Sequence, residues 1–83
     1  MLLPKNIIED EWIVEYLSKR DLIKQYIKAK QYILNWFSSQ TNLKERQPKG
    51  TNIWYFRINK QYRAIGSFDN DWDLRIFKID DHS

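Results

Sequence analysis

Residues 53–66 read IWYFRINKQYRAIG, two largely apolar runs with Asn59, Lys60 and Gln61 between them. Aromatic and β-branched side chains fill both runs, and such side chains are enriched in strands. A short polar segment between two such runs is typical of a hairpin turn. The stretch therefore predicts two antiparallel strands, and the rest of the fold is expected to form around them.

The length of the turn determines which residues of the two predicted strands face each other. A loop of three residues places Ile58 opposite Tyr62. On one side of the sheet, each large residue then faces a small one, in the pairs Phe56–Ala64 and Trp54–Gly66. On the other side, the same register places Arg57 directly opposite Arg63.

These opposed arginines are the main indication of function in the sequence. Like charges at directly opposed positions destabilise a sheet. We therefore expect an anion to lie between Arg57 and Arg63. Tyr55 is predicted on the same face, where an exposed aromatic ring is typical of a surface that stacks an RNA base. Tyr55 is equally consistent with a place in the core or in a protein interface.

The net charge of +3 is unevenly distributed along the chain. Between Leu43 and Arg63, six Lys or Arg residues accompany a single acidic residue, Glu45. Such a concentrated basic segment predicts a phosphate-bearing partner. The alternative is a solvated loop whose lysines only confer solubility. The candidate phosphate-binding residues are Lys44, Arg46, Lys49, Tyr55, Lys60 and Lys78.

Composition limits the chemistry that the chain can perform. It contains no cysteine, so disulfides and thiolate metal sites are excluded. His82 is the single histidine, which excludes a zinc site built from imidazoles and leaves carboxylates as the remaining metal ligands. No cofactor is expected. The 83 residues, rich in aromatic side chains, predict one domain over residues 1–83 with one core.

The N-terminal segment from Met1 to Lys5 is too short, and interrupted too early by Pro4, to be a signal peptide. No apolar run approaches the length that spans a membrane. The sequence therefore predicts a soluble cytoplasmic protein without a membrane partner.

Two helices are expected before the hairpin. Asn6 followed by Glu9 matches a capping box, and the acidic residues from Glu9 onward favour a helix N-terminus. Apolar residues recur every four positions from Ile8 to Tyr16, although the alternation over residues 12–16 also permits a strand. We therefore predict a first helix that begins near Asn6.

Residues 18–21 indicate a second cap or a kink, and a longer helix is expected to follow and to end near Ser38 and Ser39. Lys24 and Lys28 lie on its predicted solvent side. Its apolar stripe is expected to face the sheet as core. The stripe consists of Leu22, Tyr26, Ala29, Ile33 and Trp36.

The remaining segments complete the predicted fold. Residues 40–52 contain Pro48 and Gly50 and predict an irregular loop, and residues 69–71 predict a turn. Residues 74–79 predict a third strand, whose apolar residues on both sides of the alternation indicate an interior position. The expected fold class is α+β, with N-terminal helices packed on one face of a small antiparallel sheet of three to four strands.

The residues from Leu43 to His82 resemble the C-terminal half of the RelE/ParE toxin superfamily, and most closely its YoeB-like and HigB-like branches. The resemblance rests on the run Ile53–Ile58, on Tyr62 with Arg63, and on the near-terminal His82. It implies a RelE-like fold and the toxin of a type II toxin–antitoxin system. The implied activity is ribosome-dependent mRNA cleavage without a metal. The implied partners are a cognate antitoxin, in a hetero-oligomer, and mRNA on the ribosome.

The resemblance also implies roles for individual residues. Arg63 would contact the phosphate, His82 would be the acid–base group, and Arg57 occupies a second arginine position of the family. Glu45 lies near the position of a carboxylate base, with a gap in the spacing. The chain departs from the family in two ways: no aromatic or basic residue follows His82, and an N-terminal strand is not evident.

The chemistry of RNA cleavage fits these residue types. Attack by the 2′-hydroxyl requires a base, cations that stabilise the charge developing on phosphorus, and an acid for the leaving oxygen. Arg57 and Arg63 fit the cationic role, with Lys49 or Lys78 in support. His82 fits the acid, because imidazole titrates near neutrality.

Several alternatives remain at this stage. Glu45 or Asp81 would serve as base, or Asp81 would orient His82. Arg57 would instead form an ion pair with Asp69 or Glu45. At the level of function, the alternatives are a ParE-like inhibitor of DNA gyrase without nuclease activity and a non-toxic nucleic-acid-binding module on the same fold.

Overall fold

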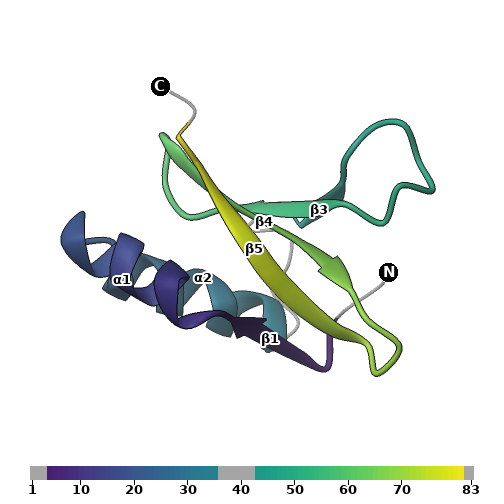
Figure 1. The fold of residues 1–83 in the computed structure, drawn as a ribbon, viewed down its shortest axis with the longest axis horizontal. Coiled ribbons are helices and arrows are strands. Elements are labelled where there is room, and N and C mark those ends of the chain that lie inside the picture. Colours follow the sequence, from purple (N-terminus) through teal and green to yellow (C-terminus); the bar gives the residue numbers. More distant parts are fainter. Residues whose placement is uncertain (1–3, 36–42, 82–83) are drawn as a thin grey trace.

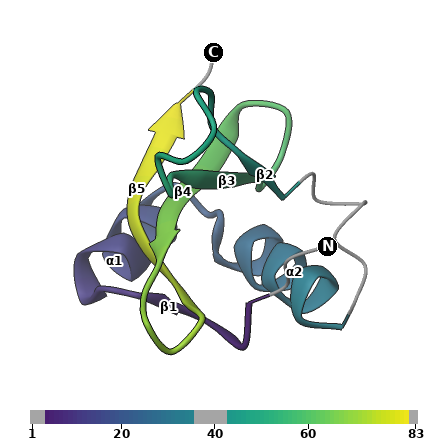
Figure 2. The same cartoon turned by 90° about the vertical axis from the view of Figure 1, so that its right-hand side faces the viewer.

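The computed structural model describes residues 4–35 and 43–81, which form two helices on one side of a five-stranded sheet (Figures 1 and 2). The strands lie in the order β1-β5-β4-β3-β2, and only the β1–β5 pair is parallel. The elements are β1 (Asn6–Glu9), α1 (Glu11–Lys19), α2 (Ile23–Leu34), β2 (Lys44–Glu45), β3 (Trp54–Arg57), β4 (Tyr62–Phe68) and β5 (Asp73–Asp81).

The predicted antiparallel sheet of three to four strands is wrong, because the sheet is mixed and has five strands: β1 and β2 join the three strands predicted individually. Residues 6–9, predicted to begin a helix, form β1 and pair with Asp73–Ile76 of β5. Ile7 is buried in the core from this strand, and the side chain of Asn6 donates a hydrogen bond to Asp73. The capping pattern at residues 6–9 was misleading, since the partner of this segment lies near the other end of the chain.

The helical predictions are confirmed from residue 11 onward. Ile13 and Leu17 of α1 are fully buried, and α1 ends at Lys19. The predicted break follows, with Asp21 in the left-handed region at φ 57°. The stripe of α2 is core as expected, with Tyr26, Ala29 and Ile33 as its buried residues.

The C-terminal end of α2 differs from the prediction. The helix ends at Leu34, and the amide of Asn35 donates back to the carbonyl of Gln31. The expected end at Ser38 and Ser39, and the stripe residue Trp36, lie outside the described residues.

The central hairpin has the predicted register. The pairs are Trp54–Gly66, Tyr55–Ile65, Phe56–Ala64 and Arg57–Arg63. The amide of Ile58 donates to the carbonyl of Tyr62 at 2.9 Å, which closes the three-residue loop. Asn59 Oδ1 accepts from the amides of Gln61 and Tyr62, both at 2.8 Å, so the turn is held by its own side chain.

β5 lies in the interior of the sheet, between β1 and β4, as the sequence predicted. A bulge interrupts its pairing with β4, where Ile65 faces Lys78 while the next residue, Gly66, faces Ile76. Phe77 is the extra residue. The bulge shifts the alternation by one position, so Leu74, Ile76 and Ile79 all reach the core while Phe77 and Lys78 are exposed.

Gly66 makes this bulge possible. A Cβ atom at this position would fall well inside van der Waals contact of the carbonyl oxygen of Arg75. The backbones of β4 and β5 therefore approach each other in a way that only glycine permits.

Candidate nucleic-acid interface

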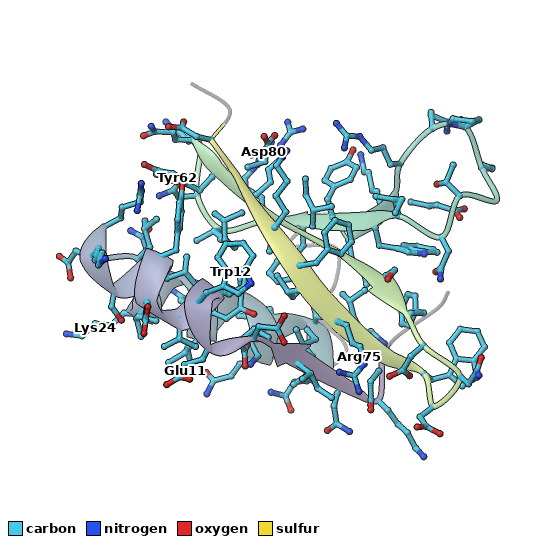
Figure 3. The ribbon with its side chains drawn as sticks, viewed as in Figure 1. Glu11, Trp12, Lys24, Tyr62, Arg75 and Asp80 are labelled. Atoms are coloured by element: carbon cyan, nitrogen blue, oxygen red, sulfur yellow. The ribbon has the colours of Figure 1, made fainter. Side chains whose placement is uncertain are left out.

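The side of the sheet opposite the helices carries most of the predicted site residues. Strand register places Arg57, Arg63 and Asp80 in one row across β3, β4 and β5. Figure 3 shows Asp80 on this side, pointing away from the helices. A second, parallel row consists of Lys44, Tyr55, Ile65 and Lys78, on strands β2 to β5. We call the two rows together the arginine face, which consists of Lys44, Tyr55, Ile65, Lys78, Arg57, Arg63 and Asp80.

The two arginines lie on the same side of the sheet, as the hairpin register requires. Arg57 is exposed and Arg63 is half-buried. The guanidinium carbon of Arg63 lies 5.3 Å from the centre of the Tyr55 ring, within the range of a cation–π contact. Tyr55 therefore helps to orient Arg63. With Lys44, these residues line a small hollow of about 90 Å³.

The arginines have no acidic partner among residues 4–35 and 43–81. The ion pairs in this part of the chain are Lys30–Glu9 at 2.7 Å and Arg75–Asp69 at 2.9 Å. The predicted alternative, in which Arg57 pairs with Asp69 or Glu45, is therefore not what the structure shows. Three cations line the small hollow, and no acidic residue lines it with them.

A larger hollow of about 250 Å³ adjoins these residues, between the end of β5 and the loop after β2. Ile65 forms apolar surface there and is only 4 % exposed. Asp80 contributes a carboxylate beside Arg63, its direct partner in the register. The remaining lining residues are Lys44, Glu45, Arg46, Gln47 and Tyr55.

Asp80 is a member of the site that the sequence pattern did not predict. It belongs to the same row as the two arginines only because the bulge shifts the alternation of β5. Without the bulge, continued alternation from Leu74 and Ile76 would place Asp80 on the helix side of the sheet. Asp80 could have been predicted only from the register between β4 and β5, which extends the row of Arg57 and Arg63 onto β5.

Glu45 is engaged by the loop that follows it. Its Oε2 accepts from the amides of Gly50 at 3.2 Å and Asn52 at 3.3 Å. Gly50 has a φ of 95°, which favours glycine. In the register, Glu45 faces Trp54, whose side chain packs against the core. The Glu45 carboxylate thus holds the loop that carries the exposed residues Arg46 and Lys49.

Three further predicted residues lie at or near this end of the sheet. Lys78 is exposed on the arginine face, and Lys60 is exposed in the hairpin turn. Asp81 pairs with Tyr62 in the register and accepts from the Gln61 side chain at 2.9 Å. His82 lies outside the described residues.

One group of carboxylates in the described part of the chain has the spacing of a metal site, at Asp69, Asp71 and Asp73. Partial desolvation alone would raise the pKa of Asp69. Hydrogen bonds from the Asp73 amide, the Arg75 side chain and the Asp71 amide outweigh this effect and lower that pKa. The Asp69 oxygens are thus already used by the β4–β5 turn, remote from the arginine face.

Among the residues described, no helix is long and apolar enough to cross a membrane. Neither a comparison with protein-family models nor a comparison with curated proteins finds a match for this chain.

Proposed function

We propose that this chain is the toxin of a type II toxin–antitoxin system, an endoribonuclease that cleaves mRNA on the ribosome by attack of the 2′-hydroxyl without a metal. The observation that supports this proposal best is the directly opposed pair of Arg57 and Arg63, which has no acidic partner in the described part of the chain. The strand β1 adds support, since the lack of an N-terminal strand was one departure from the family that the sequence resembles.

In this proposal the phosphodiester lies between the two guanidinium groups. Guanidinium forks match pairs of phosphate oxygens, and their charge stabilises the additional negative charge of the phosphorane. Lys44 adds a third positive charge at the same small hollow. Binding of the phosphate also relieves the repulsion between the arginines, because the ligand supplies the negative charge that the unbound sheet lacks between them.

Asp80 is better placed to be the general base than Glu45 or Asp81. Its carboxylate lies in the row of the arginines, whereas the Glu45 carboxylate is bound to loop amides and Asp81 is bound to Gln61. His82 is the proposed general acid, because an imidazole with an ordinary pKa of about 6.5 donates a proton readily near neutral pH.

Residues around this centre would bind the flanking RNA. Tyr55 offers an aromatic surface beside Arg63, and Arg46, Lys49 and Lys78 extend the positive charge on both sides. A cognate antitoxin would cover the arginine face with an acidic segment. The site of action would be the cytoplasm, where ribosomes translate mRNA.

The proposal is tested by inducing the chain in bacteria and mapping the 5′ ends of cellular mRNA. We expect cuts in phase with codons. Arg63→Ala and His82→Ala should each abolish them, since removal of one group that stabilises a transition state typically lowers the rate by about 10²–10³. Arg75→Ala is the matched control, because this arginine is paired with Asp69 away from the site.

Each other outcome contradicts the proposed activity. DNA damage without mRNA cuts would identify a gyrase inhibitor, and normal growth without cuts would identify a non-toxic binding module. If Arg63→Ala and His82→Ala both remain fully toxic and still cut mRNA, the assignment of the site is wrong.

A further inference from the structure

A third hollow, of about 290 Å³, lies between α2 and the end of the central hairpin. Its volume is near the lower end of the range for small-molecule sites, ~300–1,000 Å³. One wall comes from α2 and the other from the end of β3 and the turn after it. The lining residues are Gln25, Lys28, Ala29, Tyr32, Arg57, Ile58 and Asn59.

The chemistry of this hollow suits one nucleotide. Ala29 and Ile58 are buried and provide apolar surface in its lining. Lys28 and Arg57 provide two positive charges, and none of the lining residues is acidic. The Lys28 ammonium nitrogen lies 5.8 Å from the centre of the Tyr32 ring, so a cation and an aromatic ring meet in one wall.

A hydrogen bond joins the two walls of the hollow. Asn59 Nδ2 donates to Gln25 Oε1 at 2.9 Å. The amide group of Gln25 is thereby oriented, and its NH₂ group remains a donor for the edge of a base. The contact links α2 to the hairpin turn, so the hollow is built from two elements that hold each other in position.

Arg57 connects this hollow with the proposed phosphate site. Arg57 lines both the hollow of about 90 Å³ beside Arg63 and the hollow of about 290 Å³ beside Lys28. A single strand of RNA whose phosphate lies between Arg57 and Arg63 therefore reaches the second of these hollows, which carries the charge of Lys28, by passing Arg57 toward α2. Because Arg57 lines both hollows, the two lie on either side of the same residue.

We propose that the hollow formed by Lys28, Tyr32 and Asn59 binds the nucleotide adjacent to the one held by the arginine pair, with Lys28 contacting its phosphate. This inference rests on the proposed function, because it assumes that RNA binds at the arginine face. It adds a second subsite on α2 and predicts that more than two nucleotides are needed for full affinity.

The test measures binding of labelled 2′-O-methyl oligouridines, which lack the attacking hydroxyl, by fluorescence anisotropy at several salt concentrations. We expect Lys28→Gln to weaken binding of a hexanucleotide several-fold. The slope of log K against log salt should fall by about 0.7, the value for one phosphate contact on a single strand. Binding of a dinucleotide should be unchanged by the same substitution.

Lys24→Gln is the matched control. Lys24 is one turn earlier on α2, is exposed, and does not line the hollow; Figure 3 shows it pointing away from the sheet. The substitution removes the same charge from the same helix. It should therefore leave hexanucleotide binding and its salt slope close to those of the unsubstituted protein.

Two different results separate failure of the inference from failure of the proposed function. If Arg63→Gln weakens binding but Lys28→Gln behaves like Lys24→Gln, the second subsite is disproved while the arginine site stands. If the unsubstituted protein binds no oligouridine, or binds it equally well after Arg63→Gln, the proposed RNA site itself is disproved. As a second readout, the side-chain amide resonance of Gln25 should shift with the hexanucleotide and not with the dinucleotide.

Discussion

The two sides of the sheet differ in their side chains, although residues of both sides alternate along the same strands: one side is apolar and buried, and the other carries opposed charges. On the helix side, Phe56 and Ala64 are fully buried and Ile79 is 6 % exposed. On the other side, Arg57 and Arg63 face each other in a register that repels them. Three consecutive residues of β3 therefore alternate between the two sides: Tyr55 and Arg57 lie on the arginine face, and Phe56 lies in the core.

The two sides differ more in whether their charged side chains are paired than in how exposed those side chains are. Two cations away from the arginine face, Lys30 and Arg75, have carboxylate partners. Arg57 and Arg63 have none among the residues that the structure describes. Proteins tend to violate the rules of stable packing at functional sites, so the contrast supports the proposal that the helix side stabilises the fold and the arginine face binds the ligand.

The largest effect is expected from a buried residue of β3. Phe56 is fully buried and stacks on Tyr26 with the ring centres 6.2 Å apart. Phe56→Ala should lower the free energy of unfolding by about 3–5 kcal/mol, because it removes a large apolar group and leaves a cavity. Urea denaturation measures this change.

Tyr55→Ala is the matched control for Phe56→Ala on the opposite face. It should lower the free energy of unfolding much less than Phe56→Ala does, and it should weaken binding of oligouridine. If the two substitutions destabilise the protein equally, the proposal that one face stabilises the fold and the other binds RNA is wrong.

The second prediction concerns the bulge that brings Asp80 into the row of the arginines. Gly66→Ala places a methyl group against the carbonyl of Arg75, so β4 and β5 must separate. We expect a loss of about 1–3 kcal/mol, the usual result of overpacking. Gly50→Ala is a useful comparison, because its Cβ would meet no atom within 4 Å and only its positive φ opposes the change.

The third prediction concerns a polar contact between β1 and α2. Glu9 Oε1 accepts from Tyr26 at 2.6 Å and from Lys30 at 2.7 Å. Partial burial alone would raise the pKa of Glu9, but these two hydrogen bonds and the charge of Lys30 outweigh it and lower that pKa below its ordinary value. The ionised carboxylate therefore stabilises the folded state.

The sign of the pH dependence follows from this lowered pKa. The stabilisation by Glu9 is fully present above its unfolded pKa, ~4.3, and is lost as the pH falls through the lower folded value. Glu9→Gln keeps an acceptor for Tyr26 but does not titrate. Urea denaturation over a series of acidic pH values should show a shallower loss of stability in this variant, and an unchanged acid profile would contradict the assignment.

The smallest effect is expected on the arginine face itself. Arg57→Gln removes the repulsion with Arg63 and should raise the free energy of unfolding by about 0.2–1 kcal/mol, the range for pairs of opposed residues in a sheet. Thermal denaturation at low salt is the appropriate measurement, since salt screens the repulsion. A clear loss of stability would show that Arg57 has a structural partner instead of a ligand.

Features that depend on neighbouring residues could be predicted from the sequence. The length of the turn determined the hairpin register and therefore the opposition of Arg57 and Arg63. Helical spacing identified Tyr26, Ala29 and Ile33 as core. Both patterns repeat over a few residues, because side-chain direction follows the local period of the backbone.

Contacts between distant segments were decided only by the tertiary structure. The pairing of β1 with β5 joins the two ends of the chain, the bulge depends on how closely β5 approaches Gly66, and Asp80 joins the arginines as a result. No local period encodes these contacts, since a short extended segment acquires its structure from the strand beside which it packs. The opposed arginines therefore follow from the sequence alone, whereas the carboxylate and the α2 hollow beside them follow from packing.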